Sequence, residues 1–428
     1  MKLFLGIDVG TSGVRTAVVD AAGNVIAATS VKMEPPIRVD GRPCQDANIW
    51  WNGVCDCLHR LSHVLGQLGH RMSDVSAIAV DGTSGTLLLT DAQLAPVTRG
   101  YMYNSANFDK QAARIEEHAP ENSFARGSGS TLARLLFLQE QTSRPAHHAL
   151  HQADWIAAKL MNRGGMSDET NVLKMGYDVV HRTWPTWLPD CGVEMDLVPA
   201  VTPVGHLLDV VDPRSIATFG FSAETRVVAG ATDSNAAFLA SGASQIGDGV
   251  TSLGTTLAIK LLSELPIVDP SRGIYSHRIG NMWLPGGASN TGGGVLLKYF
   301  TAEQMERMEP DLNPATATGL DYYPLSDPGE RFPIANASLP ARLTPRPNND
   351  TIFYQAMLEG ISEIERIGYD ALNQLGAPKL NRVFTAGGGA RNRAWLQIRA
   401  RTLGVPVVDA FSAEAVVGAA RIAAGLIP

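Results

Sequence analysis

The sequence predicts a two-domain α/β protein in which a similar unit occurs twice. A chain of 428 residues is too long for one ordinary hydrophobic core, so two domains are expected. Apolar strands joined by a short turn of glycine and hydroxyl residues occur at 3–20 and again at 250–262, about one domain length apart. Segments with the apolar spacing of helices alternate with these strands.

The first strand pair runs Leu3-Phe-Leu-Gly-Ile-Asp-Val-Gly-Thr-Ser-Gly-Val-Arg-Thr-Ala-Val-Val-Asp20. Its apolar run brings Asp8 to the end of a strand, and a Gly-Thr-Ser-Gly turn follows. Consecutive N–H groups and hydroxyls in such a turn form a nest for an anion, and a carboxylate beside it can hold a cation. The stretch therefore predicts a site for metal-bound phosphate, with a plain β-hairpin as the alternative.

Two further stretches repeat this pattern. One is Val250-Thr-Ser-Leu-Gly-Thr-Thr-Leu-Ala-Ile-Lys-Leu-Leu262, and the other, between the first two, is Ile78-Ala-Val-Asp-Gly-Thr-Ser-Gly-Thr-Leu-Leu-Leu-Thr90. If the hairpins at 3–20 and 250–262 come from two similar domains, they are expected to face each other across a cleft. The alternative is three unrelated hairpins in a chain with 42 glycines.

The first half of the chain is predicted to hold most of the short elements. In order, we expect hairpins to about residue 32, a Pro-rich loop at 34–43, a helix at 48–68, a strand at 75–80, and helices at 108–118, 132–141 and 153–161.

The second half is predicted to follow a Pro-rich irregular stretch at 181–225. We place the domain boundary at its end, which gives domains 1–228 and 229–428. A second Pro-rich stretch, 309–349, is too apolar and aromatic for a free linker, so we expect an ordered loop over the core. A helix at 351–375, a strand at 382–386 and a small-residue helix at 413–424 follow. The last helix, about 412–428, is expected to be able to pack back on the first domain.

Composition excludes several classes of function. The net charge of −7 argues against nucleic acid or an anionic membrane as the main partner. No apolar stretch approaches the length of a membrane span, and the N-terminus reads as a strand rather than a signal peptide, so we expect a cytoplasmic protein. The four cysteines are expected to be free thiols. His147, His148 and His151 are expected to be surface residues of a helix rather than metal ligands.

Two more segments suggest chemistry. Residues 383–397 read as a strand, a glycine turn and a helix, an arrangement that accepts a phosphate or a flat ring. There, Asn392 can make paired hydrogen bonds and Trp395 offers an aromatic ring to a base. Asp233 ends a strand just before a helix, where it would serve either as a general base towards a hydroxyl or as a helix N-cap. Taken together, these parts predict phosphoryl transfer.

The order of these motifs resembles the FGGY carbohydrate kinase family, and the resemblance covers nearly the whole chain. It implies an α/β protein with two ribonuclease H-like (actin-like ATPase) domains flanking a catalytic cleft. The motifs that carry it are, in chain order, Ile7-Asp-Val-Gly-Thr-Ser12 (first phosphate motif), Ala231-Thr-Asp233 (catalytic base), Ser252-Leu-Gly-Thr-Thr256 (second phosphate motif), Gly329-Glu-Arg-Phe-Pro333 (a Gly-Glu-Arg-x-Pro loop), Gly387-Gly-Gly-Ala-Arg-Asn392 (adenosine motif) and Glu414-Ala-Val-Val-Gly-Ala-Ala420 (closing helix).

By position, the resemblance implies that Asp233 deprotonates the sugar hydroxyl that attacks the γ-phosphate of ATP. Asp8 and Asp233 are implied to hold Mg²⁺ through water, and Asp8, Ser84 and Asp233 to contact the sugar. The residues implied to bind ATP are Thr11, Ser12, Gly254, Thr255, Thr256, Gly293, Gly388, Gly389, Asn392 and Trp395.

The sugar is predicted from smaller differences. Where xylulose kinases carry Gln-Met-His-Gly, this chain has Gly82-Thr-Ser-Gly-Thr86, and it lacks the Arg-Glu pair of glycerol kinases. The Trp-x-Asp-x-Arg region of many members stands here as Tyr103-Asn-Ser-Ala-Asn107, without the acid or the arginine. The pattern and compact length look most like the D-ribulose kinase-like, xylulose kinase-related subgroup. D-ribulose is therefore the predicted substrate, and a monomer or homodimer the predicted state.

Other functions stay open at this point. Within the same class, the alternative is a xylulose or polyol kinase. In another class, the alternatives are an actin-like nucleotide-binding protein and a catalytically silent sensor of sugar or nucleotide. The changes at 104–107 favour the sensor, and the intact motifs favour an active enzyme.

Overall fold

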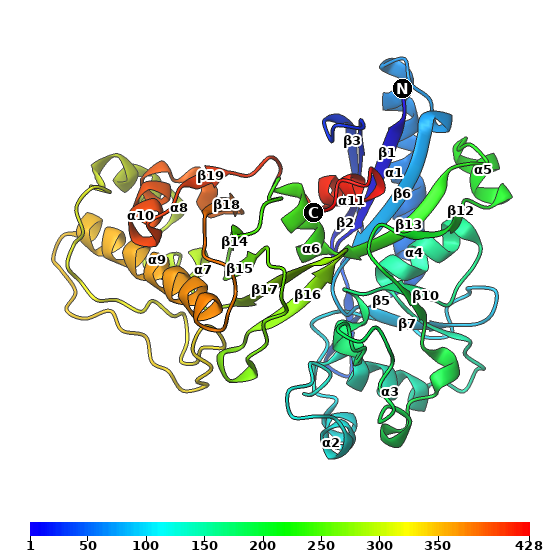
Figure 1. Cartoon of the computed structure of the whole chain (residues 1–428), viewed down its shortest axis with the longest axis horizontal. Coiled ribbons are helices and arrows are strands. Elements are labelled where there is room, and N and C mark those ends of the chain that lie inside the picture. Colours follow the sequence, from blue (N-terminus) through cyan, green and yellow to red (C-terminus); the bar gives the residue numbers. More distant parts are fainter. The chain divides into compact units, whose positions relative to one another are not determined.

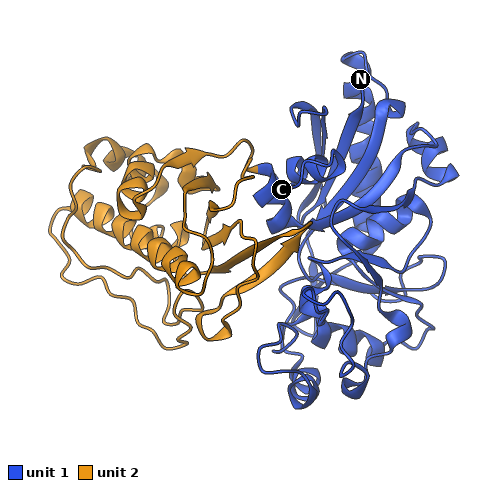
Figure 2. Cartoon of the chain, in the orientation of Figure 1, with its two compact units in different colours: residues 1–240, 414–427 blue, residues 241–413, 428 orange.

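A computed structural model describes the whole chain, Met1 to Pro428, as two compact units (Figures 1 and 2). Unit 1 comprises residues 1–240 and 414–427, and unit 2 comprises residues 241–413 and 428. The chain leaves unit 1 after α6 (Asp233–Ala240), whereas the boundary expected from the sequence lies at residue 228. The reason is that α6 packs against α11 (Ala415–Ala423) within unit 1.

The main sheet of unit 1 has six strands in the order β12-β13-β6-β1-β2-β3. The strands are β1 (Leu3–Val9), β2 (Gly13–Val19), β3 (Val25–Lys32), β6 (Val75–Gly82), β12 (Leu207–Val210) and β13 (Arg226–Thr232). Strands β13, β6 and β1 run parallel, so their carboxyl ends meet at one edge of the sheet. These strands are apolar on both faces, as expected when helices cover both sides.

Side chains on β1 alternate between two layers of helices. Leu5 and Ile7 belong to a core shared with α1 (Ala47–Gln67) and α4 (Gln152–Met161). On the opposite face, a Cβ at Gly6 would lie 2.2 Å from the Val416 carbonyl oxygen of α11. Only glycine lets α11 approach the strand backbone this closely, and Asp8 lies on the same face as Gly6.

Unit 1 also contains a smaller sheet in the order β4-β5-β8-β7-β9. Its strands are β4 (Ile37–Val39), β5 (Arg42–Gln45), β7 (Leu87–Thr90), β8 (Gly100–Tyr101) and β9 (His148–His151). Unit 1 also contains the α-helices α2 (Asp109–His118), α3 (Thr131–Gln141) and α5 (Pro213–Phe219) and the strand pair β10 (Met166–Asp168) and β11 (Ala200–Thr202). The expectation of surface histidines on a helix was wrong, because His148–His151 pairs with β7 and His151 is buried.

Unit 2 repeats the strand arrangement of unit 1. Its sheet has the order β16-β17-β15-β14-β18-β19, with β14 (Asp248–Leu253), β15 (Leu257–Leu261), β16 (Tyr275–Ile279), β17 (Met282–Ala288), β18 (Arg382–Ala386) and β19 (Val407–Asp409). Strand β14 is antiparallel to β15 and parallel to β18, just as β1 is antiparallel to β2 and parallel to β6. The duplicated unit predicted from the two hairpins is confirmed.

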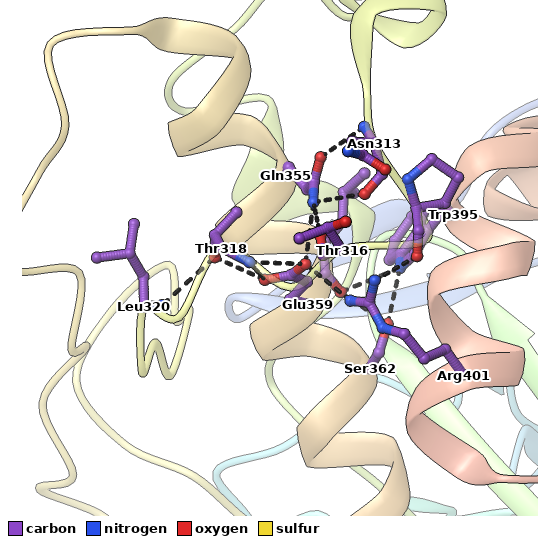
Figure 3. Close-up of polar contacts among 11 residues, drawn as sticks. Asn313, Thr316, Thr318, Leu320, Gln355, Glu359, Ser362, Trp395 and Arg401 are labelled. Atoms are coloured by element: carbon purple, nitrogen blue, oxygen red, sulfur yellow. Dashed lines mark hydrogen bonds and ion pairs between the residues drawn. The ribbon is translucent and has the colours of Figure 1, made fainter.

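The Pro-rich stretch before α9 (Asp350–Gln374) is ordered, as predicted. The Gln355 amide donates to the carbonyls of Asn313 and Thr316 and accepts from the Asn313 N–H. Glu359 accepts from the N–H and hydroxyl of Thr318 (Figure 3). Buried polar groups on one face of α9 therefore hold this loop on the core. None of the helices combines the length and hydropathy that crossing a membrane would require.

Candidate active site

Three aspartates gather where the parallel strands of unit 1 end. Asp8 on β1 pairs in register with Asp81 on β6, and Ala231 on β13 pairs with Asp81 from the other side. Asp233 follows two residues later as the first residue of α6, where it is half-buried. Asp81 was not among the predicted site residues, although it occupies the position before the third Gly-Thr turn.

The Asp8 and Asp81 carboxyl groups are buried side by side. Asp8 Oδ2 accepts a hydrogen bond from Arg15 Nη1 at 2.9 Å. Burial raises the pKa of Asp8, and the Arg15 cation opposes that rise. Burial raises the pKa of Asp81 more strongly, and the negative charges of Asp8 and Asp233 add to the effect. Neither Asp81 oxygen has a hydrogen-bond donor in the protein, so burial and the neighbouring carboxylates both favour the neutral form of Asp81.

The turn after Asp81 is braced by polar groups on two helices. The Thr83 N–H and hydroxyl both donate to Gln152 Oε1, at 3.2 and 2.9 Å. Arg134 on α3 donates to the carbonyl of Gly85. The predicted sugar ligand Ser84 lies half-buried at the tip of this turn. The structure therefore holds Ser84 on a fixed turn directly beyond the aspartates.

Each predicted phosphate hairpin keeps its hydroxyl residues accessible. The turn between β1 and β2 is closed by a Gly10 N–H to Gly13 carbonyl bond and leaves Ser12 exposed and Thr11 partly exposed. The turn between β14 and β15 leaves Thr255 and Thr256 exposed.

In unit 2 the second hairpin meets the glycine turn after β18. A cavity of about 540 Å³ lies between them, a size typical of small-molecule sites. The predicted ATP residues that line it are Gly254, Thr255, Gly293, Gly388, Gly389, Asn392 and Trp395. Thr11 and Ser12 belong to unit 1, and Thr256 does not line this cavity.

Close backbone packing shapes one wall of this cavity. Gly292 precedes the short helix α7 (Gly293–Leu296) with φ of +144°, and a Cβ there would lie 2.7 Å from the backbone of Thr255. The N–H groups of Gly293 and Gly294 donate to the carbonyls of Gly254 and Thr255. The hairpin turn and α7 therefore form one rigid wall.

Asn392 and Trp395 have internal partners as well as lining the cavity. Asn392 caps α10 (Arg393–Leu403) by accepting from the Trp395 N–H at 2.7 Å, and its amide donates to the Tyr354 hydroxyl at 3.1 Å. The Trp395 indole N–H donates to the Leu358 carbonyl and the Ser362 hydroxyl (Figure 3). Trp395 is thus a largely buried wall, and Tyr354, which sequence reasoning missed, joins it in lining the cavity.

Comparisons with known proteins match nearly the whole chain to carbohydrate kinases. Models of the FGGY family of carbohydrate kinases match residues 3–240 for the N-terminal domain and 249–426 for the C-terminal domain. An autoinducer-2 kinase from Yersinia pestis bv. Antiqua (strain Angola) is 26% identical, with 99% of this chain and 85% of the relative covered.

Solved structures share the fold. The xylulose kinase of Rhodospirillum rubrum superposes with a TM-score of 0.86 at 22% identity, covering 99% of this chain and 89% of that one. Plasmodium falciparum glycerol kinase with ADP gives 0.83 at 14% identity, with the same coverage. The two-unit α/β fold is thus that of the actin-like sugar kinases. The chain belongs to the FGGY family of carbohydrate kinases.

Proposed function

We propose that this kinase transfers the γ-phosphate of ATP to a hydroxyl of a ketopentose, with D-ribulose as the first candidate. The observation that supports it most is the convergence of two glycine turns, at Gly254 and Gly388, on one cavity of unit 2. Backbone N–H groups at such turns suit phosphates, and the deeper apolar wall suits a flat base.

In this proposal Asp233 is the general base. Its carboxylate begins α6 and is half-buried, so it is both held in place and accessible to a small substrate. It would accept the proton of the attacking sugar hydroxyl, while Asp8 and Ser84 orient the sugar.

Magnesium is compatible with the side chains present. Asp8 and Asp233 supply carboxylate oxygens, the ligand type that Mg²⁺ prefers. No group of three or more His, Cys, Asp or Glu side chains is arranged to hold a metal by itself. We therefore infer that Asp8 and Asp233 would hold Mg²⁺ through water, and that the ion would neutralise charge on the phosphates.

The choice of sugar rests on the turn at 82–86. Thr83 is bonded to Gln152 and Thr86, which leaves Ser84 as the hydroxyl residue at the tip. Xylulose, gluconate and glycerol kinases are among the solved structures with this fold, so a xylulose or polyol kinase remains the alternative. A cytoplasmic location and a monomeric or homodimeric state stay predictions.

The proposal is tested by sugar-dependent ADP release with Mg-ATP. The panel is D-ribulose, L-ribulose, D-xylulose, L-xylulose, ribitol, xylitol, glycerol, gluconate and autoinducer-2. We expect one ketopentose to give a kcat/KM well above the others. A higher value for another compound would replace D-ribulose, and no stimulation with ATP binding intact would favour the catalytically silent sensor.

Asp233→Asn tests the base directly. Asparagine keeps the size and shape of the side chain but cannot accept the proton, so kcat should fall by roughly a hundredfold to ten-thousandfold. The ATP dissociation constant should stay within about twofold, because no cavity residue of unit 2 changes. Sugar-dependent turnover near the wild-type rate would rule out Asp233 as the base.

A further inference from the structure

A line of buried hydrogen bonds connects the turn after β10 with the end of β13. Asp168 Oδ1 accepts from the Thr170 N–H at 2.8 Å, the Thr170 hydroxyl at 2.6 Å and the Asn171 N–H at 3.1 Å. The Thr232 N–H then donates to Thr170 Oγ1 at 2.9 Å. Asp168, Thr170 and Thr232 are each at most 3% exposed, so water does not compete for these bonds.

The chemistry of the groups sets the direction of this line. A backbone N–H can only donate, so the Thr170 oxygen must be the acceptor for Thr232. The single hydroxyl hydrogen of Thr170 is then directed at the Asp168 carboxylate. Asp168 is in turn held by the Asn171 amide, which donates to Oδ2 at 2.6 Å. Thr170 is the only side chain that joins this rigid turn to β13 by a hydrogen bond to Thr232 N.

The far end of the line is the residue before Asp233. Thr232 ends β13, and its hydroxyl accepts from the Asn235 amide of α6 at 2.8 Å. Thr232 is therefore fixed from both sides, by Thr170 at its backbone nitrogen and by Asn235 at its side chain. A shift of Thr232 would move the Asp233 carboxylate with it.

We propose that Thr170 is a positioning residue for Asp233. Its hydroxyl group links the rigid turn at Asp168 to Thr232, and so holds in place the end of β13 that carries the base. The inference rests on the proposed function, in which Asp233 accepts the proton. Small errors in the placement of a catalytic group reduce the rate strongly, by about a hundredfold for a displacement of about 1 Å.

Thr170→Val is the informative variant because valine keeps the shape and removes the hydroxyl. Using the full chain and the sugar with the highest kcat/KM, we expect kcat to fall by roughly tenfold to a hundredfold, with both KM values within about twofold. Thr170→Ser, which restores the hydroxyl, should recover most of the rate. Hydrogen exchange of the Thr232 amide should become faster in Thr170→Val and return towards wild type in Thr170→Ser.

Thr225→Val is the matched control. Thr225 is fully buried just before β13, and its hydroxyl donates to the Val75 carbonyl at 2.8 Å. Its substitution removes the same kind of bond near the opposite end of the same strand. We expect a comparable loss of thermal stability with kcat unchanged.

The outcomes separate this inference from the proposed function. Unchanged exchange at Thr232 in Thr170→Val would overturn the connection, whatever the substrate. Faster exchange with an unchanged kcat, or an equal kcat loss in Thr225→Val, would overturn the positioning role. Activity retained in Asp233→Asn would instead refute the base assignment itself.

Discussion

Asp168 shows how a single buried carboxyl couples stability to pH. Burial raises its pKa to about 6, and the charge of Asp154 on α4 adds to that rise, while bonds from Thr170 and Asn171 oppose it. Asp154 also bonds to the buried His151 ring at 2.9 Å, at the N-terminus of α4. Because the pKa of Asp168 in the folded state lies above the ordinary aspartate value of 3.8, the folded state binds more protons than the unfolded state between about pH 4 and pH 6.

Stability contributed by Asp168 should therefore fall as the pH rises through that window. Asp154→Asn removes the neighbouring negative charge, lowers the pKa of Asp168 and should make this fall smaller. The measurement is the difference in melting temperature between pH 4 and pH 7 for wild type and variant. Only this difference, which is the slope of melting temperature against pH, is compared between wild type and variant, because the variant also changes the contact with His151. An unchanged slope would contradict the coupling of the two carboxyls.

At the scale of elements, α3 organises the loops around the predicted sugar ligand Ser84. The Arg134 guanidinium is fully buried and bonds to backbone carbonyls, among them those of Gly85, Tyr103 at 3.3 Å and Ser105 at 2.8 Å. No carboxylate pairs with it, and burial lowers the pKa of Arg134 to about 10. One side chain thus joins the 82–86 turn to the 103–107 segment, the two segments on which the prediction of the sugar rests.

Arg134→Lys should loosen both loops because an ammonium cannot reproduce the planar fork of a guanidinium. We expect the KM for the sugar to rise by roughly tenfold, with the ATP dissociation constant unchanged. Arg126→Lys is the control, since Arg126 also donates to two carbonyls, Glu116 and Ala119, but only at the end of α2. Equal effects of the two variants on sugar KM would contradict the role of Arg134.

At the scale of the whole molecule, the two ends of the chain close the same unit. β1 and α11 lie together although more than 400 residues separate them, because α11 packs on β1 and α6. This contact depends on glycines: a Cβ at Gly418 would lie 1.7 Å from the Ala236 carbonyl oxygen. Such overlap cannot be relieved by rotating a side chain.

Gly418→Ala should destabilise unit 1 by about 1–3 kcal/mol through overpacking. Gly66→Ala is the control, because a Cβ at Gly66 in α1 would meet nothing within 4 Å. That substitution should stabilise the protein by about 0.5–1 kcal/mol, since alanine favours a helix over glycine. Thermal denaturation of both variants should give shifts of opposite sign, and a stabilising Gly418→Ala would contradict the packing.

Much of the fold could be predicted because its signals are local. The helices expected at 48–68 and 351–375 are α1 and α9, and each observed end lies within one residue of the expected one. Their signals, which are the apolar spacing and the polar N-caps Asp46 and Asn349, come from residues that are close together in the sequence. The glycine turns were recognised for the same reason, and several of them meet at the cavity of unit 2.

What the sequence by itself determined was therefore the longer helices, the duplicated hairpins and the family that their order indicates. Only the tertiary structure decided which polar residues share a site. Thr170 and Arg134 carry no local signal, because each is a single polar residue in an ordinary turn or helix, whereas Asp81 precedes a Gly-Thr turn, a local signal that the prediction did not use. The roles of the three residues arise from strand register, which pairs Asp8 with Asp81, and from burial, which places the Thr170 hydroxyl against the Thr232 N–H and the Arg134 guanidinium against the Gly85 carbonyl. Register and burial depend on contacts between residues far apart in the chain, and no window of neighbouring residues contains them.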